Sequence, residues 1–368
     1  MVLGAVLPRR GRLVVRADRA ARVARGDQDF VESPSFGRQA PPYSPKVAVG
    51  DLNCSPGGGC SPGTVTSKGK LMPATLPPRI GIIGGSGLDE GLLGSGGAEP
   101  VSVHTPFGPP AAAPVLAQWR GIPLAILARH GRGHIYPPGA VPYRANIFAL
   151  KALGCRWILA TGAVGSLRPG IAPRELVLVD QAIDRTLQRP RSFFDAAAVH
   201  VAFAEPVCET LRRRIYASRG ALGPAVKVHP RGTYLCMEGP SFSTRAESRL
   251  YRSWGADVIG MTLLPEARLA REAQISYACI ALVTDYDCWK VQRAGRGDDA
   301  GALLQEIRGN LRYGAENAVA LIRAALPRIW AAREETFPAH RALELAIWSD
   351  QKKISAAAKR KLGPLWPG

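Results

Sequence analysis

Two carboxylates, Asp285 and Asp287, follow an apolar segment closely enough to share one ligand. The stretch from Ile275 to Trp289 reads I-S-Y-A-C-I-A-L-V-T-D-Y-D-C-W, which predicts a buried strand that ends at the acids. Side chains two residues apart on an extended chain point the same way. Two carboxylates held close together do not both ionise easily, so one is expected to keep its proton near neutral pH. Such a pair can donate to N7 of adenine and accept from its 6-amino group.

A second set of polar groups is expected at other strand ends and suits an oxyanion. The set comprises Ser86 in the turn 84–87, Arg129 and His130 after the strand 123–128, backbone amides around Ala163 after the strand 157–160, and Thr262 after the strand 256–260. Ligands of open α/β sheets bind beyond the carboxyl ends of the strands, and donors of these kinds bind phosphate. Phosphate at one end and a purine at the other indicate phosphorolysis of an N-glycosidic bond, in which protonation makes the base a better leaving group.

The elements that must position these residues alternate between strands and helices. Strands are expected at 80–83, 123–128, 157–160, 175–180, 233–237, 256–260 and 275–284, with helices at 145–154, 205–220, 244–254 and 265–274. This alternation predicts a three-layer α/β domain over residues 78–347, with a largely parallel or mixed central sheet flanked by helices. Residues 1–71 are rich in Arg, Pro, Gly and Ser, so we expect a disordered or mis-started extension there. Residues 348–368 are expected to be a basic tail.

Local signals mark two helix boundaries. Thr244 and Glu247 have the spacing of a capping box, which predicts a helix start. Pro327 is expected to end a long amphipathic helix, and a shorter helical segment is expected at 339–347.

Composition limits the other classes of function. The formal charge of +19 would suit nucleic acid, but the basic residues are dispersed and no Lys/Arg run is interleaved with aromatic residues, so no nucleic-acid partner is expected. Seven cysteines without a C-x-x-C motif suit a reducing compartment and give no zinc or disulfide framework. No apolar run has the length of a membrane span, and the N-terminus lacks the apolar core of a secretory signal. We therefore expect a cytoplasmic protein with no membrane partner.

From about Ile80 to Leu326 the sequence resembles the trimeric purine nucleoside phosphorylases, and most closely their 5′-methylthioadenosine branch. The motifs that carry the resemblance include A-R-H-G-R-G-H at 128–134, E-G-P-S-F-S-T-R-A-E-S at 238–248, W-G-A-D-V-I-G-M-T at 254–262 and V-T-D-Y-D-C-W at 283–289. The resemblance implies phosphorolysis of 5′-methylthioadenosine to adenine and 5-methylthioribose 1-phosphate. It also implies a homotrimer with active sites near subunit interfaces, inorganic phosphate as co-substrate, and no metal or organic cofactor.

Residue roles carried over by position agree with the chemistry expected from the acids. Asp285 is similar to the acid that protonates N7, and Asp287 to its partner at the 6-amino group. Met261 resembles the residue that packs on the ribose, and Phe242 a wall of the base pocket. His200 resembles the residue that a neighbouring subunit lends to the 5′ end of the sugar. The five oxyanion-binding positions match the phosphate site of the family.

Several positions depart from the family pattern, so alternative functions stay open. Gly162 stands where the family usually has Thr or Ser, and Ser241 replaces an Arg common in the methylthioadenosine branch, as in the 6-oxopurine branch. Ser243 and Asp285 stand where that branch has Glu and Asn, which favours a 6-aminopurine. The segment after Lys290 is longer and more charged than usual, so the 5′ preference is open. The alternatives are a 6-oxopurine nucleoside or methylthioinosine phosphorylase, and a non-catalytic purine or phosphate sensor.

Overall fold

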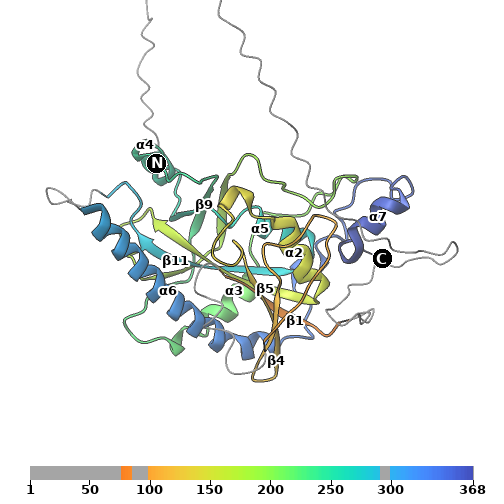
Figure 1. Cartoon of the computed structure of the whole chain (residues 1–368), viewed down its shortest axis with the longest axis horizontal. Helices are drawn as coiled ribbons and strands as arrows, with labels where there is room; N and C mark the ends of the chain where they lie inside the picture. The colour runs from red at the N-terminus through yellow and green to blue at the C-terminus, as the bar shows by residue number, and fades with distance from the viewer. Residues whose placement is uncertain (1–75, 85–97, 291–298, 368) are drawn as a thin grey trace, which may run out of the picture. The chain divides into compact units, whose positions relative to one another are not determined.

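The computed structural model describes residues 76–84, 98–290 and 299–367. The expected extension at 1–71 and the candidate phosphate ligand Ser86 therefore lie outside the described residues. The described strands form one 11-stranded mixed sheet (Figure 1). Its main path has the order β2-β3-β4-β1-β5-β10-β9-β7, and a branch runs from β5 through β11 and β6 to β8.

The strands and helices have the following bounds. The strands are β1 (Arg79–Gly84), β2 (Glu99–Pro100), β3 (Val115–Trp119), β4 (Ile122–Ala128), β5 (Cys155–Ser166), β6 (Leu176–Leu178), β7 (Gln181–Arg185), β8 (Val228–His229), β9 (Thr233–Met237), β10 (Val258–Gly260) and β11 (Ser276–Asp285). The helices are α2 (Tyr143–Ala152), α3 (Glu209–Tyr216), α4 (Arg245–Ser253), α5 (Glu266–Glu272), α6 (Asp299–Trp330) and α7 (Ala356–Leu362). Short 3-10 turns occur at Pro138–Ala140, Arg219–Ala221, Pro338–Arg341 and Gly363–Leu365.

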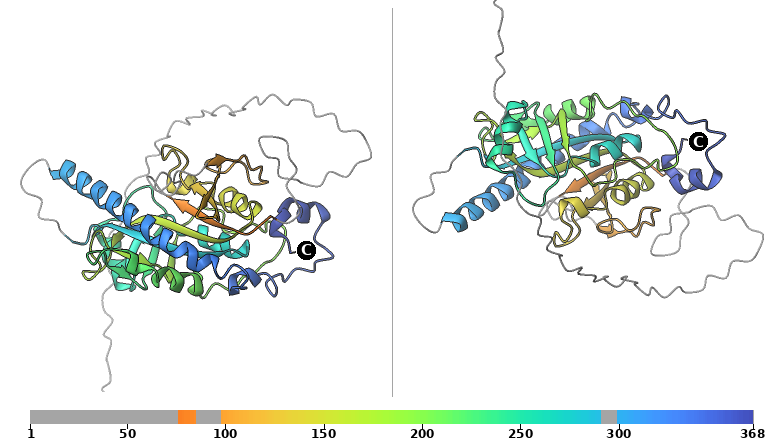
Figure 2. Two further views of the ribbon diagram at one scale, coloured as in Figure 1. Left: turned by 90° about the horizontal axis from the view of Figure 1, so that it is seen from below. Right: turned by 90° about the horizontal axis from the view of Figure 1, so that it is seen from above.

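Helices cover both faces of the sheet, and β11 is buried between them. Along β11, Tyr277, Cys279, Ala281 and Val283 belong to the core cluster that contains residues of α2 and α5, whereas Ala278, Ile280 and Leu282 belong to the cluster that contains residues of α3 and α6. Figure 2 shows α2 and α6 on opposite sides of the sheet. A strand buried on both faces needs apolar side chains at every position, which explains the unbroken apolar run in the sequence. The expected three-layer α/β architecture is confirmed.

The central strand β5 has different neighbours along its length. Its first half pairs in parallel with β1, up to the pair Ile83 and Ala160, and β11 pairs in parallel along the other edge. Its last two residues, Gly165 and Ser166, pair with β10 in the antiparallel direction. Both β1 and β10 pair with the same edge of β5. Between Ala160 and Gly165 no described strand pairs with that edge. Residues 161–164 therefore present backbone groups at an open edge inside the sheet.

The helix boundaries partly follow the local signals. The hydroxyl of Thr244 accepts from the N–H of Glu247, and the Glu247 carboxylate accepts from the N–H of Thr244, so the capping box is confirmed. The expectation that Pro327 ends the long helix is wrong, because α6 continues to Trp330. Proline lacks an N–H, but its fixed φ suits a helix. The chain beyond Pro327 remains helical, and the N–H of Ala331 donates to its carbonyl at 2.9 Å.

The C-terminal region differs from the expected helix and tail. Only a 3-10 turn, Pro338–Arg341, forms within the segment expected to be helical, and turns follow it. The segment expected as a tail contains α7 and packs on the domain: Leu362 and Leu365 are buried in the core, and Trp366 meets Phe194 edge to face. Among the described residues, no helix combines the length and the apolar character needed to cross a bilayer.

Candidate active site

The two acids meet through a turn rather than along a strand. The strand β11 ends at Asp285, and Asp287 adopts a left-handed conformation with φ of 50°. The two residues therefore do not lie on one extended strand with side chains on the same face. The N–H of Asp287 donates to Oδ1 of Asp285 at 2.7 Å, which keeps the two residues together. A Cβ at Gly165 would lie 2.9 Å from the same oxygen, so only glycine fits beside the pair.

The environment of Asp285 favours its protonated form. Burial raises the pKa of Asp285, and the hydrogen bonds from the Thr284 hydroxyl and the Asp287 N–H oppose this shift without cancelling it. The negative charges of Asp287 and Glu306 act in the same direction as burial. A carboxyl group whose pKa is raised can hold a proton and deliver it to a base.

Thr284 can satisfy both protonation states of this acid. Its Oγ1 lies 2.7 Å from Oδ2 of Asp285 and 3.2 Å from the carbonyl oxygen of Val164. A hydroxyl carries one proton and can also accept. It donates to the ionised carboxylate, or it accepts from the protonated acid and donates to Val164. Asp287 has a separate partner, because the Ser243 hydroxyl donates to its Oδ1 at 2.7 Å.

Arg129 lies buried just beyond β4 and is paired with Glu266. Its Nε and Nη2 donate to the two oxygens of that carboxylate at 2.7 and 2.8 Å, and its Nη1 donates to the carbonyl of Thr161 at 2.7 Å. Burial alone would lower the pKa of Arg129, but the charge and hydrogen bonds of Glu266 outweigh burial and raise it. A guanidinium has five N–H donors, so two remain for a ligand.

His130 is fixed as a neutral acceptor. Its Nδ1 lies 2.8 Å from the carbonyl oxygen of Tyr136, which can only accept, so Nδ1 carries the proton. Burial lowers the pKa of His130 to about 4, and the cations Arg129 and Arg189 act in the same direction. Because the ring is neutral near pH 7, its Nε2 presents a lone pair, which can accept from a protonated oxygen of phosphate. The ring stacks on His134 with centroids 4.0 Å apart.

The segment around Ala163 is a strand, not the expected loop. The strand β5 runs through to Ser166, and Thr161 directs its carbonyl oxygen to Arg129 at the open edge. Alternate residues of a strand direct their backbone groups to the same edge. The N–H of Ala163 therefore points to the same open edge, and the expected amide donor is available without a loop.

Gly162 and Thr262 lie side by side across this edge. A Cβ at Gly162 would lie 3.2 Å from Oγ1 of Thr262, which follows β10. Arg129, the Ala163 amide and Thr262 thus belong to neighbouring strand ends around residues 161–164. The structure brings together these candidate phosphate-binding groups, with the exception of Ser86, which lies outside the described residues.

The three candidate residues for the nucleoside have unequal surroundings. Met261 packs against the turn at Gly239, where a Cβ would lie 2.6 Å from its sulfur. Phe242 follows this turn and is 86% exposed, so the chain itself does not cover its ring. His200 lies beside the C-terminal segment: its N–H donates to the Ala346 carbonyl at 2.8 Å, and its ring meets Trp348 edge to face at 4.8 Å. Its role at the sugar stays a prediction.

Two residues that hold the site residues in place were not predicted from the sequence. Glu266 and Arg189 are both buried, and each contacts residues far away in the sequence. Glu266 is an acid in the first turn of α5, which is a common position for a solvated acid and therefore no signal. Arg189 lies in a basic segment with Arg191 that reads as a solvated loop.

The acid pair at the end of β11 and the polar groups at the open edge of β5 together form one candidate site at the strand ends. Residues 79–327 match the model of the Phosphorylase superfamily. The chain belongs to that superfamily, and the resemblance of its motifs to the purine nucleoside phosphorylases is confirmed.

Two relatives within this family carry the same name. S-methyl-5'-thioadenosine phosphorylase of Gloeobacter violaceus is 47% identical over 291 residues, which cover 78% of this chain and 94% of the relative. The protein of the same name from Geobacter sulfurreducens is 46% identical over 285 residues, which cover 77% and 96%.

Solved structures agree with the sequence relatives. The crystal structure of a methylthioadenosine phosphorylase from an antarctic soil metagenomic library has a TM-score of 0.72 and 42% identity, and covers 79% of this chain and 99% of its own. Methylthioadenosine phosphorylase from Schistosoma mansoni, in complex with tubercidin, has a TM-score of 0.65 and 33% identity, and covers 74% and 100%.

Proposed function

We propose that the protein is an S-methyl-5′-thioadenosine phosphorylase, a pentosyltransferase that converts 5′-methylthioadenosine and phosphate into adenine and 5-methylthioribose 1-phosphate. Such a reaction serves purine and methionine salvage. The observation that carries the proposal is the raised pKa of Asp285 beside an anion-binding edge of the sheet. The names of the relatives support the same substrate.

The acid pair acts on the purine. Protonated Asp285 donates to N7 while Asp287, held by Ser243, accepts from the 6-amino group. As the bond between C1′ of the sugar and N9 breaks, its electron pair moves to the purine. The proton from Asp285 neutralises the departing base, which lowers the barrier to departure. The ionised Asp285 then receives the hydrogen bonds of Thr284 and Asp287.

The anion-binding groups act on phosphate. The remaining donors of Arg129, the Ala163 amide and the Thr262 hydroxyl hold its oxygens, and Nε2 of neutral His130 accepts a hydrogen bond from its protonated oxygen. Ser86, outside the described residues, is expected to add a second hydroxyl. An unprotonated phosphate oxygen attacks C1′ and forms the new C–O bond. Inorganic phosphate is the co-substrate, and the chemistry requires neither a metal nor an organic cofactor.

Assembly as a homotrimer would complete the sugar pocket. Leu345 and Trp348 are 92% and 74% exposed, and they lie in the same C-terminal segment that contacts His200. Exposed apolar side chains of this size mark interaction surfaces. A second copy on this surface would bury them and bring His200 to the 5′ end of its neighbour's nucleoside.

Cytoplasmic location is supported by the cysteines. The five described cysteines are unpaired thiols, namely Cys155, Cys208, Cys236, Cys279 and Cys288. Thiols persist in reducing compartments, where disulfides are rare.

A nucleoside panel tests the proposed reaction. The purified protein is assayed with 5′-methylthioadenosine, adenosine, inosine, guanosine and methylthioinosine, with and without phosphate, and both the base and the sugar phosphate are quantified. We expect phosphate-dependent release of adenine, with 5′-methylthioadenosine as the preferred substrate. Tight purine binding without turnover would instead identify a sensor and refute the proposal.

The same panel tests the alternative of a 6-oxopurine nucleoside phosphorylase. Ser241 favours that alternative, because it is like the residue of the 6-oxopurine branch. Asp285 disfavours it, because it stands where that branch has Asn, and burial raises its pKa in the direction that a proton donor to N7 of a 6-aminopurine needs. Faster phosphorolysis of inosine or methylthioinosine than of 5′-methylthioadenosine would establish the alternative.

A further inference from the structure

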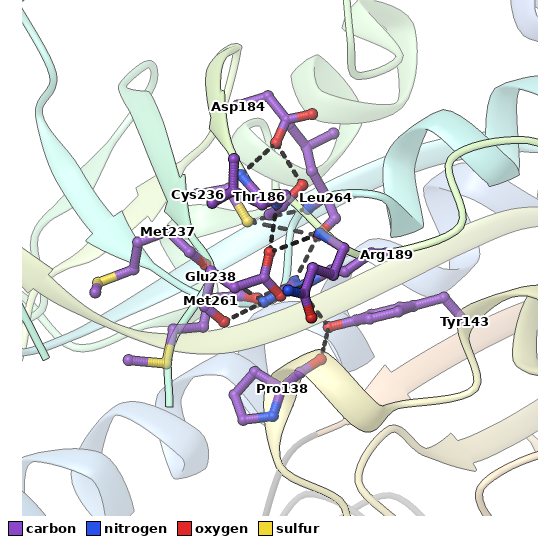
Figure 3. A network of polar contacts seen from close by, with 12 residues as sticks. Pro138, Tyr143, Asp184, Thr186, Arg189, Cys236, Met237, Glu238, Met261 and Leu264 are labelled. Carbon is purple, nitrogen blue, oxygen red and sulfur yellow. Dashed lines mark hydrogen bonds and ion pairs between the residues drawn. The ribbon is translucent and has the colours of Figure 1, made fainter. Parts of the chain in front are cut away.

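Arg189 is the centre of a polar network behind the candidate active site (Figure 3). The residue is 4% exposed and follows β7. Its Nε donates to Oε1 of Glu238 at 2.9 Å, and its Nη2 donates to the carbonyls of Glu238 and Met237 at 2.6 and 3.4 Å. Its Nη1 donates to the carbonyls of Met261 and Leu264 at 2.5 and 2.8 Å and to the Tyr143 hydroxyl oxygen at 3.3 Å. These six contacts engage all five N–H donors of the guanidinium. Arg189 therefore has no donor left for a substrate.

The carbonyls that Arg189 binds belong to two segments of the site. The first segment, 237–243, leaves β9 and leads to Phe242 and to Ser243, whose hydroxyl donates to Asp287. The second segment, 261–264, leaves β10 and contains Met261 and Thr262. One segment thus supports the acid at the purine, and the other carries the candidate sugar and phosphate contacts.

The two segments also touch each other at the point where Arg189 joins them. A Cβ at Gly239 would lie 2.6 Å from the sulfur of Met261, so the Met261 side chain packs directly on the first segment. The N–H of Leu187 donates to the other oxygen of Glu238 at 2.5 Å, which ties the Arg189 segment to the same acid. A shift of either segment would therefore break several hydrogen bonds at once.

We propose that Arg189 is a positioning residue that fixes the separation between the purine-binding and phosphate-binding segments. This inference rests on the proposed phosphorolysis, in which phosphate must reach C1′ in line with the departing base. Removing the guanidinium leaves up to four carbonyls without their donor, and buried groups of this kind do not stay unpaired without rearrangement. A displacement of about 1 Å far from the reacting atoms can lower a rate by about 100-fold.

Two substitutions of Arg189 and one matched control test this inference. Arg189→Met removes all donors, and Arg189→Lys keeps the charge but loses the planar fork. The control is Arg212→Met: Arg212 is also 4% exposed and also binds a carboxylate and a carbonyl, those of Glu209 and Pro230, but it lies on α3 in the opposite layer.

Steady-state kinetics with each substrate varied, together with Tm, give the readout. We expect both Arg189 variants to lose about 100-fold in kcat/KM for nucleoside and for phosphate, measured well below their Tm. We expect Arg212→Met to lower Tm and to leave both KM values unchanged. Arg189 variants that are folded and keep both kcat/KM values within about threefold of wild type overturn the inference.

A further variant covers the case in which the Arg189 variants do not fold. Glu238→Gln weakens one of the six Arg189 contacts, so a smaller fall of both kcat/KM values in the same direction is expected. Wild-type kinetics in Glu238→Gln would count against the inference. If wild type itself releases no adenine in a phosphate-dependent way, the proposed function fails. Calorimetric binding of adenine and of phosphate to wild type and Arg189→Lys then decides the role of Arg189, because unchanged affinity for both refutes it.

Discussion

The N–H of Asp287 donates to Oδ1 of Asp285 at 2.7 Å. The acid proposed to protonate the purine is therefore held by the backbone of its own partner. This contact needs the left-handed turn at Asp287 and the absence of a side chain at Gly165. The fold of the single chain therefore fixes the two carboxylates relative to each other before any substrate binds.

Asp285→Asn tests the proton donor. We expect the rate of adenine release from 5′-methylthioadenosine to fall by about 100-fold or more, because an amide cannot transfer a proton to N7. We also expect the preference to shift toward 6-oxopurine nucleosides. Steady-state assays with 5′-methylthioadenosine and inosine measure both effects. Asp195→Asn is the control, since that carboxylate is 54% exposed and pairs with Arg144. Unchanged kinetics of Asp285→Asn on both substrates would contradict the assigned role.

Gly162→Ser tests the phosphate side of the site. The new hydroxyl would lie beside Thr262, since a Cβ at this position is 3.2 Å from its Oγ1. One added hydrogen bond to a charged group is worth about 1.5 kcal/mol, so KM for phosphate is expected to fall roughly tenfold. Gly162→Ala adds the Cβ without the hydroxyl and serves as the control. If the Ser variant binds phosphate no better than the Ala variant, Gly162 does not face phosphate.

His340 makes the fold sensitive to acid. Its Nε2 lies 3.1 Å from the carbonyl of Arg156, so this nitrogen carries the proton, and Nδ1 accepts from the Arg156 guanidinium. Burial lowers the pKa of His340 to about 4, whereas the unfolded value is about 6.5. Between these values the unfolded chain binds a proton that the folded chain lacks, so stability falls as the pH falls from about 6.5 toward about 4.

His340→Gln should therefore flatten the acid side of a plot of Tm against pH. Only part of the slope is expected to disappear, because the lowered pKa of His130 acts with the same sign. His104→Gln is the control at an exposed position. Equal slopes for His340→Gln and wild type would show that His340 does not contribute to acid sensitivity.

Leu345→Asp tests the proposed assembly. A charge at this position, 92% exposed in the single chain, would be costly inside an interface. Light scattering after gel filtration is expected to show a trimer for wild type and a smaller species for the variant. Activity should fall with it, because His200 would no longer reach a neighbour. Leu250→Asp, on α4, is the control at a position 46% exposed. A monomeric and active wild type would refute the trimer.

Local patterns were enough to predict the layers of the fold. The unbroken apolar run of β11 reflects burial on both faces, and the Thr244 capping box marks the start of α4 because both of its hydrogen bonds are local. Four of the five candidate oxyanion-binding positions lie among the described residues, and each follows or lies on a strand as expected; their role at phosphate stays a prediction.

Long-range contacts could not be predicted from one sequence. The segment T-G-A-V-G-S at 161–166 contains two glycines and reads as a turn, but pairing with β11 keeps it extended. The partners Arg129 and Glu266 are 137 residues apart, and Arg189 and Met261 are 72 apart. The position of Arg129 after a strand predicted a site residue but not its buried partner Glu266, and nothing in the local sequence of Arg189 predicts burial.

The open edge of β5 has a consequence for how the protein should respond to its ligand. Residues 161–164 pair with β11 on one edge, but their other edge has no described strand between the residues paired with β1 and those paired with β10. A phosphate bound there would take the place of the missing strand and accept the hydrogen bond that a strand would otherwise accept from Ala163. Bound phosphate would then complete the hydrogen bonding at this edge of the sheet. We expect unfolding to be most cooperative, and amide hydrogen exchange to be slowest, when phosphate is present.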